Sequence, residues 1–394
     1  MKRVLILGGG FAGVEAAIYL RKEQFEVTLV SERDYFYIYP TSIWVPTGET
    51  PFERVCIPLD ALKKVHGFEL LIDKVLHIRS RDGAVELNSG AVLRGYDFFV
   101  IALGASKMQP EGVEHTLSIC GKPEEAMRLR ERIDALIARG SGKIAMGFGG
   151  NPSDTSAVRG GPVFETMFNV DHLLRKKGMR DRFELTLFAP MEEPGKRMGP
   201  QALKMMGKMF KQRGIYHRFG KKIMAFGPEG VTFDDGNSLT SDLTMFVPGL
   251  CGHEVVKHSD LPVNEAGFIR IDDHCRVIYD GPDGPDNVYA VGDATALEGP
   301  QWKAKQGHVA EVMARNAAFN ITQQSHGYSE RKGYGRHLNI LCVMDSGNGA
   351  VFVYRNNKRA VTVPMPIVGH WLKKLWGVYC RMSKLEKISR LPGL

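Results

Sequence analysis

The sequence contains few cysteines, and their arrangement excludes two common kinds of cysteine chemistry. Six cysteines occur in 394 residues, and no two of them form a C-x-x-C pair. Paired spacing is typical of structural zinc sites and thiol redox motifs, so the pattern predicts no metal site. A disulfide framework is not expected either in a cytosolic chain of this size. The six are Cys56, Cys120, Cys251, Cys275, Cys342 and Cys380.

Long apolar runs are also missing. No segment approaches the ~18 apolar residues that a membrane-spanning helix needs. Met1-Lys2-Arg3 is followed by only four apolar residues before glycine, which is too short for the core of a signal peptide. We therefore expect a cytoplasmic protein that does not span a membrane. Repeats of solenoid period and low-complexity tracts are absent as well.

Acidic residues are fewer than basic ones. The chain has 52 Lys and Arg against 44 Asp and Glu, a formal net charge of +8. A basic chain suggests an anionic partner such as nucleic acid, an acidic substrate or a membrane surface. No nucleic-acid motif accompanies the charge, and the basic residues gather near the C-terminus. The sequence therefore favours a membrane surface over nucleic acid.

The most informative feature is the glycine-rich turn at the start of the chain. The apolar run Val4–Leu7 leads into Gly8, Gly10 and Gly13, which fit G-x-G-x-x-G, and a helical pattern follows. A second apolar run ends at Glu32, about 20 residues further on, where a carboxylate meets an adenosine ribose. This strand–turn–helix–strand order predicts a dinucleotide site, whereas the glycine motif alone would also fit a turn without a ligand.

Two later segments suggest which dinucleotide is bound. One strand ends at Gly104-Ala105, and another runs through Val288–Val291 into Gly292-Asp293. With the first motif, they resemble the flavoproteins of the pyridine nucleotide-disulfide oxidoreductase superfamily, which contain two dinucleotide-binding domains. The resemblance implies FAD rather than NAD at the first site, with Gly104 and Asp293 among its contacts.

The same order predicts the domain organisation. We expect an α/β fold with two Rossmann-like dinucleotide-binding domains, the second inserted in the first, then a C-terminal strand pair and an amphipathic helical tail. The FAD domain would comprise 1–107 and 241–330, the inserted domain 108–240, and the C-terminal part 331–394. A chain of 394 residues is long enough for two or three such domains.

The inserted domain has a damaged second glycine motif. Gly147 and Gly149 fit, but Pro152 stands at the third position and a loop separates it from the next helix. The following strand ends at Phe188-Ala189-Pro190, with no acid to bind a ribose hydroxyl. We therefore expect poor NAD(P)H binding and a different electron donor.

Five further segments extend the resemblance to one family, that of sulfide:quinone oxidoreductase and the flavoprotein of flavocytochrome c sulfide dehydrogenase. They include a loop beside the flavin, the inserted helix, a segment after Gly-Asp and two cysteine segments. These are Tyr39–Val45, Gly161–Glu165 with Lys176–Met179, Lys305–His308 with Glu311, Leu341–Asp345, and Ser118–Cys120.

The resemblance implies a sulfur donor and a lipid-dissolved acceptor. Cys342 matches one of two family cysteines that hold sulfur beside the flavin, and Cys120 matches an auxiliary cysteine. The second sulfur-holding cysteine should lie just before Gly161-Pro162, but residues 156–160 contain none. This departure leaves the sulfur relay in question. The alternative reading of Cys342 and Cys120 is that they are buried, unreactive thiols.

Other residues receive roles from the same resemblance. Ser42 would lie near the flavin, Lys305 would place a cation by the flavin ring, and Glu165 would act in proton transfer. Lys305 would otherwise be a solvated helix lysine, and Glu165 a carboxylate favoured by a helix N-terminus. Arg159 is read either as a partner for an anion or thiolate or as an ordinary loop charge.

Residues 368–391 carry apolar side chains at helical spacing. Basic residues fill the other positions, an arrangement typical of helices that lie on membranes, where each basic residue adds about 1 kcal/mol. Packing on the protein's own core is the alternative. The apolar set is Trp371, Leu372, Leu375, Trp376, Tyr379, Met382, Leu385, Ile388 and Leu391, and the basic set is Lys373, Lys374, Arg381, Lys384, Lys387 and Arg390.

The leading hypothesis is a monotopic FAD enzyme on the cytoplasmic side of the cell membrane. It would pass electrons from sulfide, or another small sulfur donor, to quinone. A type II NADH dehydrogenase is a second hypothesis, and a non-catalytic flavin-binding partner subunit is a third. Homo-oligomer formation and the sulfur product are left open by the sequence.

Overall fold

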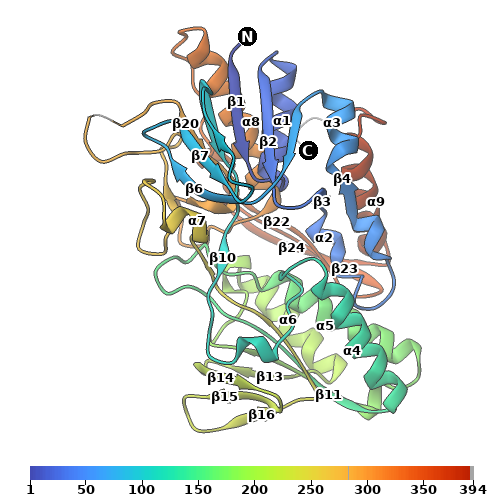
Figure 1. Cartoon of the computed structure of the whole chain (residues 1–394). Helices are drawn as coiled ribbons and strands as arrows, with labels where there is room; N and C mark the ends of the chain where they lie inside the picture. Colours follow the sequence, from blue (N-terminus) through green and yellow to red (C-terminus); the bar gives the residue numbers. More distant parts are fainter. Residues whose placement is uncertain (283, 391–394) are drawn as a thin grey trace.

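Two parallel β-sheets organise the chain in the computed structural model, which describes residues 1–282 and 284–390. Figure 1 shows the first sheet in the upper half of the molecule and the second in the lower half. The first sheet has the order β20-β9-β1-β2-β5, and its neighbours all run parallel. Its strands are β1 Arg3–Leu7, β2 Glu26–Ser31, β5 Glu69–Ile72, β9 Phe98–Ile101 and β20 Val288–Ala290.

The first sheet forms because strands such as β9 and β20 are continuous apolar runs. Residues 98–101 and 288–290 are buried throughout, as expected for parallel strands covered on both faces. Helices α1, Phe11–Lys22, and α8, Gly307–Ser325, pack against each other beside this sheet (Figure 1). Strand β20 comes from the far end of the sequence, so the first unit is built from two distant segments.

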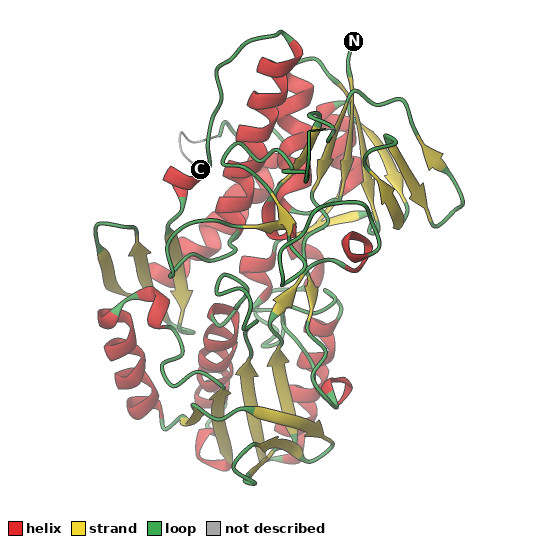
Figure 2. Cartoon of the chain, turned by 90° about the vertical axis from the view of Figure 1, so that its left-hand side faces the viewer, coloured by secondary structure: helices red, strands yellow, loops and turns green. Residues whose placement is uncertain are grey.

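The second sheet has the order β13-β12-β11-β17, again parallel. Figure 2 shows it as a separate layer below the first sheet. Its strands are β11 Gly142–Phe148, β12 Phe183–Ala189, β13 Tyr216–Phe219 and β17 Leu243–Val247, and its helices are α4 Glu125–Arg139, α5 Gly161–Lys176 and α6 Pro200–Arg213. The expected boundary at residue 240 is wrong, because β17 pairs with β11 in this second sheet.

Short antiparallel strand pairs connect the two sheets and lie at their borders. Strands β10 and β18 pair side by side where the chain passes between the two sheets. The short strands are β3 Tyr35–Tyr37, β4 Cys56–Pro58, β6 Val75–Arg79, β7 Ala84–Leu87, β8 Val92–Leu93, β10 Ser106–Lys107, β14 Ile223–Gly227, β15 Gly230–Phe233, β16 Ser238–Thr240, β18 Leu250–Cys251, β19 Ile269–Arg270 and β21 Thr295–Ala296. The short helices are α2 Tyr39–Ser42, α3 Leu59–His66 and α7 Glu254–Lys257.

The C-terminal part contains three strands rather than the expected pair. Strands β22 Ile340–Asp345, β23 Gly349–Arg355 and β24 Ala360–Pro366 form one antiparallel sheet. Strand β24 was missed because it contains Pro364 and Pro366, which a strand tolerates only at a sheet edge. Helix α9, Val368–Lys384, follows and ends earlier than the predicted tail. Leu391 lies outside the described residues.

The core has two main parts. One lies around the first sheet, α1 and α8, and the other fills the space between the second sheet, its helices and the C-terminal strands. Within the part of the chain that the structure describes, no helix is both long and apolar enough to cross a membrane.

Candidate functional site

One large cavity brings the predicted site residues together. Its volume is about 1710 Å³, above the roughly 300–1,000 Å³ typical of a small-ligand site, so a dinucleotide and a second molecule can share it. Every predicted site residue except Gly13 lines its wall. Those lining it are Gly8, Gly10, Glu32, Ser42, Gly104, Cys120, Glu165, Asp293, Lys305 and Cys342.

The three glycines of the first motif have different structural roles. Gly8 has φ +114°, and a Cβ there would overlap the Ala102 carbonyl. A Cβ on Gly13 would overlap the Gly8 carbonyl, so Gly13 allows α1 to pack on the turn. A Cβ on Gly10 would meet nothing within 4 Å, because this residue faces the cavity where α1 begins. Open space at a helix N-terminus fits a pyrophosphate.

The open space at Gly10 yields a test of cofactor placement. We expect Gly10→Val to lose most bound FAD, because its side chain fills the space left for the pyrophosphate, while the apoprotein remains folded. The flavin-to-protein absorbance ratio and the thermal unfolding midpoint measure the two effects. In contrast, Gly13→Ala should lower unfolding free energy by about 1–3 kcal/mol through overpacking. A fully loaded Gly10→Val protein would contradict the placement.

Asp293 and Arg159 meet across the cavity wall. Asp293 lies in the short helical turn Gly292–Ala294 after β20, and its carboxylate forms an ion pair with the Arg159 guanidinium. Arg159 comes from the loop before α5, so residues from the two halves of the chain meet here. Arg159 therefore lines the cavity in an ion pair with a carboxylate, and its role as a partner for an anion or thiolate stays a prediction.

Cys342 and Glu165 lie on adjoining elements. Cys342 is on β22, and Glu165 is on α5, where its carboxylate accepts a hydrogen bond from the Asp345 backbone N–H at 2.7 Å. Glu165 also forms an ion pair with Lys373 of α9. Burial raises the pKa of Glu165, which Lys373 opposes. Burial and the Glu165 charge raise the pKa of the Cys342 thiol to about 12, so it is protonated at neutral pH.

Cys120 occupies the same cavity but has different neighbours. It lies between β10 and α4, is buried, and its carbonyl accepts a hydrogen bond from Lys107 Nζ. Burial raises the pKa of its thiol, while Arg159 and Lys107 act in the opposite direction. The loop therefore brings Cys120 to the cavity, although its charged neighbours differ from those of Cys342.

Lys305 is buried, so the reading of this residue as a solvated helix lysine is wrong. It precedes α8, is 5% exposed, and its ammonium donates a hydrogen bond to the Thr295 carbonyl. The ammonium also lies 3.8 Å from the centre of the Phe268 ring. Burial lowers the pKa of Lys305 to about 7.

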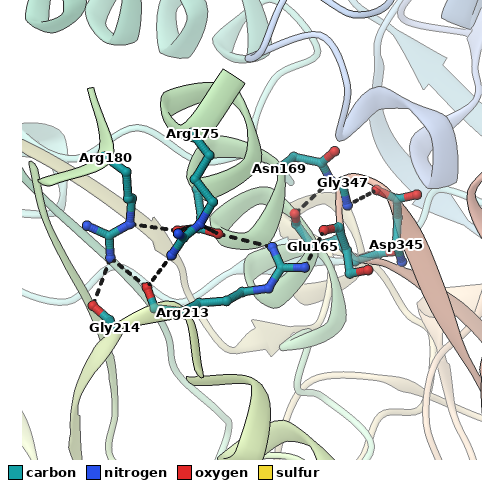
Figure 3. A network of polar contacts seen from close by, with 10 residues as sticks. Glu165, Asn169, Arg175, Arg180, Arg213, Gly214, Asp345 and Gly347 are labelled. Atoms are coloured by element: carbon teal, nitrogen blue, oxygen red, sulfur yellow. Dashed lines mark hydrogen bonds and ion pairs between the residues drawn. The ribbon is translucent and has the colours of Figure 1, made fainter. Parts of the chain in front are cut away.

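Two charged networks beside the site were not predicted from the sequence. Figure 3 shows Arg175, Arg180 and Arg213 in one cluster, beside Glu165, Asp345 and Gly347. The arginines surround the fully buried Asp171 of α5, and Arg213 also donates to the Ser346 carbonyl at 3.0 Å. This network ties α5 to the turn after β22 and so fixes the strand that carries Cys342.

The second network centres on His370 of α9. Its ring nitrogens lie 2.6 Å from Asp345 and 2.9 Å from Glu49, and these hydrogen bonds raise its pKa to about 9. Lys374 contacts the same Glu49 at 2.5 Å. The start of α9 is therefore attached to the site through charged side chains.

Helix α9 is oriented differently from the prediction. Lys373 and Lys384 are 6% and 3% exposed, whereas Trp371, Leu375 and Val378 are 58%, 63% and 59% exposed. Lys384 pairs with the buried Glu15 and with Glu311. Arg390 pairs with Glu15, and Arg381 donates to the Cys56 carbonyl. The expectation that all six basic residues face lipid is wrong, because five of them, including Lys374 through Glu49, bind the protein.

Comparisons with known proteins agree with this arrangement. The sequence model of the family described as pyridine nucleotide-disulphide oxidoreductase matches residues 2–314. A sulfide-quinone reductase of Aquifex aeolicus is 27% identical over 376 residues, covering 90% of this chain and 83% of the relative. A type II NADH:quinone oxidoreductase of Staphylococcus aureus is 22% identical over 378 residues, covering 90% of both proteins.

Solved structures show the same fold. The sulfide:quinone oxidoreductase of Aquifex aeolicus superposes with a TM-score of 0.85 at 24% identity, covering 98% of this chain and 92% of that one. NDH2 of Plasmodium falciparum superposes with a TM-score of 0.76 at 14% identity, covering 98% and 96%. The two-sheet architecture with a C-terminal helix is thus shared with both kinds of protein.

Proposed function

The chain belongs to the pyridine nucleotide-disulphide oxidoreductase family and is an FAD-dependent oxidoreductase, and from that premise we propose that it oxidises sulfide or a related sulfur donor and reduces quinone. The main support for this proposal is that Cys342 and Glu165 line the same cavity as the Gly8–Gly10 turn. A thiol and a buried carboxylate beside a flavin site suit a sulfur donor better than a hydride donor.

Under this proposal some residues of the chain bind the cofactor, and others react with the sulfur donor. When bound, FAD would supply the two-electron oxidant that sulfide needs in order to become the outer sulfur of a persulfide on a thiol, and the two electrons would go on to quinone. We assign its binding to the turn at Gly8–Gly10, to Glu32 and to Asp293. Cys342 would accept sulfur, and because its thiol is protonated, Glu165 would take the proton from Sγ. Lys373 would stabilise the ionised form of Glu165.

NADH is the second candidate donor, since a relative is named for it. Two observations disfavour it. Residues 149–160 separate β11 from α5, so no helix N-terminus follows the second glycine motif directly. The space beside Gly147 is filled by the Phe188 ring, with which a Cβ would overlap.

Rapid anaerobic mixing tests the proposal. We expect sulfide to bleach the flavin absorbance at least ten times faster than an equal concentration of NADH. Under this proposal sulfide reacts at Cys342, whereas the inserted domain has no complete binding site for NADH. Faster bleaching by NADH would overturn the proposal in favour of the NADH dehydrogenase. No bleaching by either donor would favour a flavin-binding subunit without catalytic activity of its own.

The proposal that quinone is the electron acceptor rests on the position of α9. Leu372, Trp376 and Tyr379 line the cavity, while Trp371 and Leu375 of the same helix are exposed. One helix therefore connects the flavin cavity to an apolar outer surface. We propose that this surface lies in the headgroup layer on the cytoplasmic side of the cell membrane, with quinone reaching the cavity past α9.

A further inference from the structure

The first turns of α9 place two basic side chains against two carboxylates of the site. His370 Nδ1 lies 2.6 Å from Asp345 Oδ2, and three residues later Lys373 forms an ion pair with Glu165. The two carboxylate residues are themselves connected, because the Asp345 backbone N–H donates to Glu165 Oε1 at 2.7 Å (Figure 3). A change of charge at His370 therefore reaches Glu165 through a single intervening residue.

The Asp345 carboxylate is buried at the end of β22, the strand that carries Cys342. Its Oδ1 accepts hydrogen bonds from the Gly347 backbone N–H at 2.9 Å and from Trp44 Nε1 at 3.4 Å, and its Oδ2 faces His370. Of these three partners, only His370 can carry a positive charge. Burying a carboxylate without a paired cation is costly, so protonated His370 stabilises the ionised form of Asp345.

The surroundings of His370 favour its protonated form. Its second ring nitrogen lies 2.9 Å from Glu49 Oε1, which also contacts Lys374. His172 of α5 faces the same group, and burial lowers its pKa, so it adds little positive charge at neutral pH. Strand β24 contains no ionisable side chain, and β23 contains none in the half beside which α9 begins. The charges of His370 and Lys374 therefore balance those of Asp345 and Glu49.

We propose that His370 is a positioning residue for the reaction at Cys342, because as a cation it neutralises Asp345 and so keeps Glu165 available to accept a proton. This inference rests on the proposed function, in which Glu165 takes the proton from Cys342. The negative charge of Asp345 raises the pKa of Glu165. A neutral side chain at position 370 would leave this effect uncompensated and keep more of Glu165 protonated.

The test replaces the ring by an uncharged side chain in His370→Gln and by a permanent cation in His370→Arg. Anaerobic stopped-flow absorbance measures flavin reduction from about pH 5 to about pH 10, with the hydrosulfide concentration held constant at every pH. We expect the acidic limb of the His370→Gln profile to move up by about one pH unit. His370→Arg should keep the limb of the unaltered protein. So should the control His115→Gln, which removes a histidine that is 41% exposed beside Glu114.

A second measurement does not depend on sulfide. Hydrogen bonds to Asp345 and Glu49 raise the pKa of His370 to about 9. Its contribution to stability is therefore complete below the pKa of a free histidine, about 6.5, and is lost as the pH rises through the raised value. The thermal unfolding midpoint of the His370→Gln holoenzyme should be lower than that of the unaltered protein at neutral pH, and the difference should shrink in alkaline buffer.

A lower reduction rate in His370→Gln with an unmoved acidic limb would overturn the proposal, since loss of a merely structural contact has that effect. A difference in unfolding midpoint that does not change with pH would overturn it too, because His370 would then not be the charged partner of Asp345. If sulfide bleaches the flavin and all four profiles coincide, the proposed function stands and the role of His370 fails. If sulfide does not bleach the unaltered protein, the proposed function fails and the role at Cys342 fails with it, while pH-dependent midpoints would still establish the charge pair.

Discussion

Replacing Cys342 with serine is expected to slow sulfide-driven flavin reduction by at least about a hundredfold while leaving FAD bound. Serine keeps nearly the same volume on β22 but cannot hold a second sulfur atom or serve as a sulfur nucleophile. Stopped-flow absorbance under anaerobic conditions measures the rate, and the flavin-to-protein ratio measures cofactor retention. The β22–β23 pairing of Cys342 with Val353 is a backbone contact and should survive the change.

Cys120→Ser is the matched control, because Cys120 is a second buried thiol in the same cavity. We expect this variant to keep reduction within a few-fold of the unaltered protein. Loss of reduction in Cys120→Ser together with normal reduction in Cys342→Ser would transfer the sulfur-holding role to Cys120. Normal rates in both variants would indicate direct reaction between sulfide and the flavin.

The pH dependence of the flavin reduction rate distinguishes a proton-transfer role of Glu165 from a purely structural role. The Cys342 thiol has its pKa raised to about 12, so it stays protonated across the neutral range and needs a base. If Glu165 is that base, Glu165→Gln should lower the reduction rate and remove the acidic limb of the rate–pH profile, where the carboxylate becomes protonated. A variant with a lower rate but an unchanged profile would indicate that Glu165 only positions Asp345 and Lys373.

The first sheet could be predicted because its signals are local. Each motif consists of a few consecutive residues, as in Val4–Leu7, the glycine turn and Gly292-Asp293. The structure places Gly8, Gly10 and Asp293 on the wall of one cavity. The boundary at residue 240 could not be predicted in the same way. The apolar run Leu243–Val247 suits a buried strand of either sheet, and only its pairing with β11 decides between them.

The charges of α9 could not be predicted because their partners are distant in sequence. Lys373 and Glu165 are 208 residues apart, and Lys384 and Glu15 are 369 apart. Helical periodicity treats each lysine as a surface residue, since burying an unpaired charge is costly. Because buried carboxylates pair with Lys373 and Lys384, these lysines face the protein interior, and apolar side chains such as Trp371 and Leu375 are exposed.

The buried lysines determine how the membrane proposal should be tested. Deleting 368–394 would remove Lys373 and leave Glu165 as a buried charge without its ion pair, a loss of about 3–5 kcal/mol. It would also remove two of the cations paired with the buried Glu15, Lys384 and Arg390, which would keep its ion pair with Arg315. Reduced quinone activity in the deleted protein would then reflect damage to the cavity. Substitutions on the exposed face of α9 avoid this problem.

The triple variant Trp371→Gln, Leu375→Gln and Val378→Gln is expected to release the protein from anionic vesicles. These side chains are more than half exposed, so their replacement leaves the core intact. Each fully buried apolar side chain contributes about 1.5–3 kcal/mol, so losing three should lower the partition coefficient more than about a hundredfold. Re-oxidation by a long-chain quinone in liposomes should slow at least tenfold. Re-oxidation by a small water-soluble acceptor should be unchanged.

Ile72→Gln, Val92→Gln and Met224→Gln form the matched control, because these side chains are 49%, 48% and 49% exposed on strands away from α9. This control should sediment with vesicles like the unaltered protein. Because Lys373 and Lys384 are buried in ion pairs, raised salt should weaken vesicle binding only slightly, unlike a surface held mainly by basic residues. If the α9 variant still sediments with vesicles and still reduces long-chain quinone at the normal rate, the exposed apolar face is not the membrane contact, and the quinone proposal loses its structural support.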